Sequence, residues 1–104
     1  MDQTAFKMKL KPGFKDEYKR RHDKIWPELQ ALLTAAGIRD YSIFLDEETN
    51  TLFAVQKNSS AGLLPDLSSN VLVRKWWDYM ADIMETYSDN SPVVKPLAQM
   101  FHMD

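Results

Sequence analysis

The chain contains no cysteine, which excludes a disulfide framework and any site built on a thiolate. Its three glycines are isolated, so no glycine-rich loop is available to hold a phosphate. Its two histidines, His22 and His102, are joined by no carboxylate cluster or H-E-x-x-H pattern. We therefore expect no metal site and no cofactor.

A large excess of charge of either sign is also missing. The formal net charge is −2, so no overall field favours binding to nucleic acid. The densest basic run, Lys19-Arg20-Arg21, is offset by neighbouring acids, which is typical of a solvated helix face. No stretch approaches the length that crosses a membrane, and the N-terminal residues lack the apolar core of a secretory signal. We expect a cytoplasmic protein without a membrane partner.

Apolar residues, by contrast, are plentiful at 44% of the 104 positions. This length fits a single domain spanning residues 1–104. The apolar supply is generous for a small monomeric core, because a chain of this size buries only about two thirds of its surface. The composition therefore predicts self-association.

Hydrophobic periodicity predicts the element order βαββαβ. Strands are expected where apolar residues alternate or run between polar turns, at residues 3–10, 41–45, 52–56 and 97–103. Helices are expected at residues 16–37, ending at Gly37, and at residues 71–87. Trp26-Pro27 predicts a kink in the first helix, although proline can also begin a second helical segment. Residues 57–70 read as a loop with a short helical turn at residues 63–67.

This order is typical of an α+β fold, a ferredoxin-like βαββαβ sandwich with both helices on one face of the sheet. The two strands of the central hairpin are apolar on both faces, so the face away from the helices also needs cover. A second copy of the chain, packed sheet against sheet, would supply that cover. The pattern therefore predicts a two-fold homodimer with a pocket between helices and sheet.

The segment EYKRRHDKIWPEL, residues 17–29, holds the strongest candidate for chemistry. In a helix, His22 shares an apolar face with Tyr18 and Ile25. An imidazole can give and take a proton near neutral pH, but a histidine at the edge of a core can also be inert. Tyr18 either adds a hydroxyl beside His22 or packs as a tyrosine at the edge of the core.

Aromatic residues elsewhere in the chain could form the rest of a site. Trp76 and Trp77 project about 100° apart on a helix, so one can enter the core while the other lines its margin. An indole suits the C–H face of a sugar ring, although such residues more often only pack. Tyr41 opens a strand, where its ring could reach the mouth of the pocket or simply pack.

Several segments together strongly resemble the L-rhamnose mutarotase family. They are EYKRRHDKIWPEL, DYSIFLDEETNTLFAV at residues 40–55, RKWWDYMADIM at residues 74–84, DNSPV at residues 89–93 and the terminal FHM. The resemblance runs from residue 5 to residue 103 and departs most at residues 57–70, where it leaves the shape of one pocket wall open.

The resemblance implies a dimeric α/β-barrel of ferredoxin-like subunits that interconverts the α and β anomers of L-rhamnose without a cofactor. It implies that His22 is the proton donor and that Tyr18, Tyr41, Trp76 and Trp77 bind the sugar. An imidazolium at His22 would protonate the ring oxygen and recover the proton on ring closure.

Other functions fit the same scaffold. One is a cofactor-free, oxygenase-like enzyme acting on a planar apolar substrate. Another is a sugar-binding or sensor domain without catalysis, and a third is a purely structural assembly module. Acceleration of anomer exchange would separate the mutarotase from all three.

Overall fold

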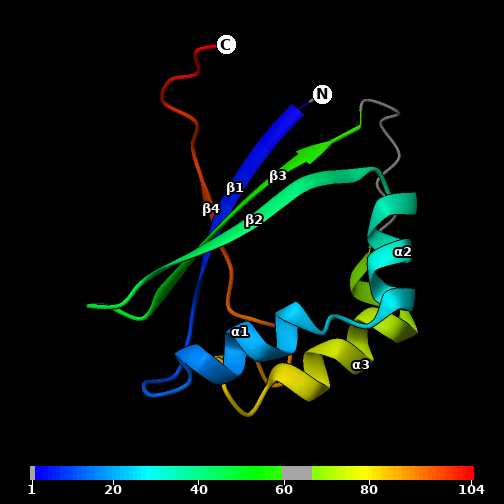
Figure 1. Ribbon diagram of the computed structural model, residues 1–104, viewed down its shortest axis with the longest axis vertical. Helices are drawn as coiled ribbons and strands as arrows, with labels where there is room; N and C mark the ends of the chain where they lie inside the picture. The colour runs from blue at the N-terminus through cyan, green and yellow to red at the C-terminus, as the bar shows by residue number, and fades with distance from the viewer. Residues whose placement is uncertain (1, 60–66) are drawn as a thin grey trace.

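A four-stranded antiparallel sheet forms one layer of the protein, and the helices lie on one side of it (Figure 1). The computed structural model describes residues 2–59 and 67–104. The strands pair in the order β2-β3-β1-β4 and span Asp2–Lys9 (β1), Ile38–Asp46 (β2), Thr51–Asn58 (β3) and Lys95–Leu97 (β4). The helices are Lys15–Asp23 (α1), Pro27–Ala35 (α2) and Val71–Met80 (α3), with a short 3-10 helix at Leu67–Ser69. The α+β class is confirmed.

The single helix predicted for residues 16–37 is wrong, because the structure has two helices there. α1 ends at Asp23, and the N–H of Ile25 already donates to the carbonyl of His22 in a tighter turn. Trp26 has an extended backbone with ψ of 127°, as expected for a residue that precedes proline. Pro27 lies in the first turn of α2, where its missing N–H leaves no hydrogen bond unmade. The proline therefore begins a second segment.

The helix predicted for residues 71–87 is also shorter, since α3 ends at Met80. The chain beyond it pairs with the end of β1 instead. Lys11 N–H donates to the carbonyl of Ile83 at 2.9 Å, and Glu85 N–H donates to the carbonyl of Lys9 at 3.1 Å. This long-range pairing satisfies backbone groups that a continued helix would have bonded internally, so it overrides the helical periodicity.

The last strand lies earlier than predicted. β4 pairs with β1 through Ala5 opposite Leu97 and Lys7 opposite Lys95, and residues 98–104 form no strand. Alternation of apolar residues predicts a strand poorly in this segment, because a strand also needs a neighbouring strand to bond its backbone. The helical turn predicted at residues 63–67 lies almost wholly outside the described residues; Leu67, its last residue, begins the short 3-10 helix.

The core lies between the helices and one face of the sheet. Leu52 and Ile83 are its least exposed large side chains, and Ala54 is fully buried. The opposite face of the sheet remains open, with Phe44 63% exposed and Leu97 37% exposed. Within the residues described, no helix is long and apolar enough to cross a bilayer.

Candidate active site

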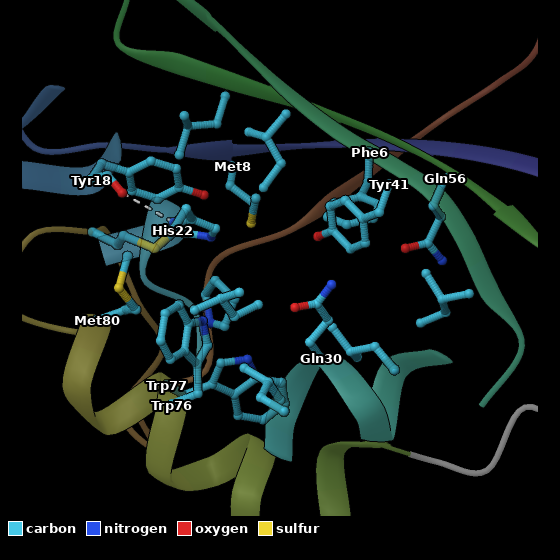
Figure 2. Close-up of a pocket in the computed structure, with 18 of the residues that line it drawn as sticks. Phe6, Met8, Tyr18, His22, Gln30, Tyr41, Gln56, Trp76, Trp77 and Met80 are labelled. Carbon is cyan, nitrogen blue, oxygen red and sulfur yellow. Dashed lines mark hydrogen bonds between the residues drawn. The ribbon is translucent and has the colours of Figure 1, made fainter. Parts of the chain in front are cut away.

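A cavity of about 930 Å³ opens between the sheet and the helices (Figure 2). This is the size range of small-molecule sites. Apolar and aromatic side chains form most of the lining, and a few polar groups point inward. All of the side chains predicted to form the site reach this cavity, namely Tyr18, His22, Tyr41, Trp76 and Trp77. The structure thus gathers residues from α1, β2 and α3 at one place.

His22 presents one ring nitrogen to the cavity and uses the other within its own helix. Its Nδ1 lies 3.1 Å from the backbone carbonyl oxygen of Tyr18. A carbonyl can only accept, so Nδ1 carries the proton of this hydrogen bond. The ring stacks on Tyr18 at 4.3 Å between centroids and makes a T-shaped contact with Trp76 at 5.4 Å between centroids. The opposite nitrogen, Nε2, is left to face the open space (Figure 2).

The burial of His22 decides its protonation state. Burial lowers the pKa of the imidazole below its ordinary value near 6.5, and the hydrogen bond to Tyr18 and the charge of Asp23 only partly oppose this. At neutral pH the ring is therefore neutral, with its proton on Nδ1. Nε2 then offers a lone pair, so His22 is set to accept a proton before it can give one.

The two tyrosines contribute hydroxyl groups that stay protonated. Tyr18 is 7% exposed, and burial raises the pKa of its hydroxyl well above the ordinary value. The Tyr41 side chain is 39% exposed, but its hydroxyl end points into the cavity, where burial raises its pKa to about 12. Neither hydroxyl has a hydrogen-bond partner among residues 2–59 and 67–104, so both are free to bind a ligand.

The tryptophan pair divides as the helical geometry predicts. Trp76 is 9% exposed and packs edge-on against Trp26 at 5.0 Å, inside the core. Trp77 is half-buried and lines the cavity. Both indoles line the cavity, Trp77 is the more exposed of the two, and Trp76 also contacts the ring of His22.

Arg21 holds α1 in place, and the sequence interpretation missed it. Its side chain is only 10% exposed. The guanidinium donates to Glu17 at 2.6 Å, to the Tyr79 carbonyl at 2.8 Å and to Asp82 at 2.8 and 3.2 Å. The run Lys19-Arg20-Arg21 predicts a solvated face, which fits Lys19 and Arg20 but is wrong for Arg21. Nothing in the local pattern marks Asp82 as its partner.

Two glutamines that the sequence interpretation left out also line the cavity, Gln30 from α2 and Gln56 from β3 (Figure 2). Gln56 donates through Nε2 to Oδ1 of Asn58 at 3.0 Å, and Asn58 in turn donates to Thr4. In the part of the chain that is described, no group of three or more His, Cys, Asp or Glu residues is placed to hold a metal ion.

Comparisons with known proteins agree on one family. The family described as L-rhamnose mutarotase matches residues 3–103. An L-rhamnose mutarotase of Bacteroides thetaiotaomicron is 59% identical over 104 residues, with 100% of both chains covered. One of Flavobacterium johnsoniae is 61% identical over 101 residues, covering 97% of this chain and 94% of the relative. The crystal structure of an L-rhamnose mutarotase from Formosa agariphila matches with a TM-score of 0.93 at 56% identity, covering 100% of both chains.

Proposed function

Because the chain belongs to the L-rhamnose mutarotase family, we propose that it is an isomerase that interconverts the α and β anomers of L-rhamnose without a cofactor. The family predicted from the resemblance of the sequence segments is confirmed. One structural observation carries the mechanism: Nε2 of a neutral His22 faces a cavity that also holds free hydroxyl groups.

The reaction moves one proton between two oxygens bonded to the same carbon. Nε2 of His22 takes the proton of the anomeric hydroxyl as the bond between C1 and the ring oxygen breaks. The imidazolium formed then gives that proton to the ring oxygen, which leaves an open-chain aldehyde and a neutral His22. Rotation about the C1–C2 bond turns the other face of the carbonyl toward the ring hydroxyl, and closure by the reverse steps gives the other anomer.

In this mechanism His22 acts first as a base. The amino-acid sequence alone predicts the opposite order, in which an imidazolium at His22 acts first as the acid. The change follows from the burial of the ring and from the hydrogen bond that keeps the proton on Nδ1. A well-placed acid or base contributes about 100- to 10,000-fold in rate. Spontaneous mutarotation is already quick, so this single group is sufficient.

The remaining residues would hold the sugar. The hydroxyls of Tyr18 and Tyr41 are protonated at neutral pH and can both donate and accept hydrogen bonds. Trp77 offers an apolar surface for the C–H groups of the ring. This combination of hydroxyls, an imidazole and an indole suits a sugar better than the planar apolar substrate of the oxygenase-like alternative.

We also propose that the protein is a homodimer in which ferredoxin-like subunits pack sheet against sheet to form a dimeric α/β-barrel. The open face of the sheet supports this, because Phe44 lies opposite Phe53 and both project away from the helices. Leu97 extends the same face across β1, where it lies opposite Ala5. Apolar side chains on an otherwise uncovered sheet face favour cover by a partner. The cytoplasmic location stays a prediction.

The deciding experiment measures magnetisation exchange between the anomeric proton signals of L-rhamnose. The wild-type protein should accelerate the exchange, and His22→Ala should lose about 100-fold or more of that acceleration. His102→Ala is the matched control, because the other histidine lies exposed in the C-terminal segment and, within the part of the chain that the structure describes, bonds only to Asp104. Absence of acceleration by the wild type would refute the mutarotase function. Full activity of His22→Ala would refute only the role of His22.

A further inference from the structure

The helix break at Trp26-Pro27 gives the cavity an additional wall. In one continuous helix, Gln30 would follow His22 along the same axis, about 12 Å farther on. The break instead sends α2 in a different direction from α1, up along the sheet (Figure 1). The side chains that α2 contributes to the cavity are Leu29, Gln30, Leu33 and Thr34.

Gln30 is the side chain of this wall with the most hydrogen-bonding capacity. Its carboxamide points into the open space, on the side where the Tyr41 hydroxyl also points, while His22 and Tyr18 lie on the other side (Figure 2). Throughout residues 2–59 and 67–104 the carboxamide has no hydrogen-bond partner. Gln56 differs, since its amide is already bonded to Asn58 at 3.0 Å. With respect to the described residues, the carboxamide of Gln30, an exposed residue, keeps its donors and acceptors for a ligand or for water.

We propose that Gln30 is a further sugar-binding residue, whose carboxamide bonds hydroxyl groups of the pyranose remote from C1. This rests on the proposed function, because the position of C1 is set by the reaction at Nε2 of His22. With C1 at His22, the far side of the ring faces Gln30 and Tyr41. A carboxamide donates and accepts at once, which matches a pair of adjacent hydroxyls.

A residue that binds the far side of the ring contacts the substrate and the transition state equally. Its removal should therefore raise KM and leave kcat nearly unchanged. A group that acts at C1 would lower kcat instead. A rise in KM with kcat unchanged therefore indicates a binding role for Gln30, whereas a fall in kcat indicates a role in proton transfer.

The test compares wild type, Gln30→Leu and Gln30→Glu by anomer exchange and by NMR titration with L-rhamnose. Gln30→Leu keeps the bulk without hydrogen bonds, and we expect KM and Kd to rise about three- to tenfold. Gln30→Glu keeps an acceptor at the same reach and should restore most of the affinity. Glu28→Leu is the control, because Glu28 is exposed on the same helix and does not line the cavity.

Deoxy analogues of the sugar sharpen the result. An analogue that lacks both hydroxyls bound by Gln30 should bind wild type and Gln30→Leu equally, an analogue that lacks one of them should bind with part of the difference, and analogues that keep both should bind the variant more weakly. Unchanged KM and Kd in a folded Gln30→Leu, or a fall in kcat alone, would overturn the proposal. If wild type binds the sugar without accelerating exchange and Gln30→Leu weakens binding, the proposed catalysis fails while the role of Gln30 stands. If wild type does not bind the sugar, both fail.

Discussion

Replacing Arg21 by alanine should destabilise the protein by about 2 kcal/mol. Arg21 connects α1, which carries Tyr18 and His22, to the end of α3 and the turn after it. The guanidinium donates to the carbonyl of Tyr79 and to both carboxylate oxygens of Asp82, and its carbon lies 4.5 Å from the centroid of the Tyr79 ring. The side chain that makes these contacts is 10% exposed. Alanine would remove all of them at once.

The magnitude follows from the separate contacts. A hydrogen bond from a charged donor to a backbone carbonyl contributes about 1.5 kcal/mol. The cation–π contact with Tyr79 adds about 0.5 kcal/mol. The ion pair with Asp82 adds little more, because that carboxylate is 65% exposed and well screened. For a domain of this size, a loss of about 2 kcal/mol lowers Tm by roughly 8–15 °C.

Thermal unfolding at fixed protein concentration measures this loss, and Arg20→Ala is the matched control. Arg20 precedes Arg21 in the same helix and also bonds Glu17, but its side chain is 53% exposed, so we expect almost no change in Tm. The two arginines lower the pKa of Glu17 from 4.5 to about 2. A lowered carboxyl pKa adds stability above 4.5 that is lost toward 2, and because both arginines cause the shift at an exposed carboxyl, this small pH-dependent part should be lost in both variants alike. Equal Tm values for the two variants would refute the reasoning.

Two further predictions concern the mechanism and the assembly. Since burial lowers the pKa of His22 and the neutral form is the base, kcat/KM should rise with pH and level off above a midpoint below 6.5. A pH profile that instead falls as pH rises through the midpoint would assign the first step to the imidazolium. Phe44→Asp should convert the proposed dimer to monomer in analytical ultracentrifugation, because it places a charge on the open sheet face. Val71→Asp, at a side chain that is 68% exposed on α3, should leave the mass unchanged, and a dimer that survives Phe44→Asp would argue against sheet-to-sheet packing.

Much of the fold was predictable because local patterns determine which faces are buried. Alternation in residues 3–10 placed Met8 and Leu10 in the core. The polar residues between the two apolar runs predicted the hairpin of β2 and β3. On α1, the spacing of four between Tyr18 and His22 put both rings on the face that lines the cavity. The sequence also predicts the helix break at Pro27. Of the two interpretations, a kink within one helix and the start of a second helical segment, the second is right.

By itself, the sequence determined the α+β class, the family and the residue types gathered around one histidine, since these depend on periodicity and on recurring segments. Only the tertiary structure decided where α3 ends, because the pairing of residues 83–85 with the end of β1 joins parts of the chain far apart. It also decided the tautomer of His22, the direction of α2 that brings Gln30 into the cavity, and the partner of Arg21. Each of these depends on which groups meet in space, and residue spacing along one helix or strand does not carry that information.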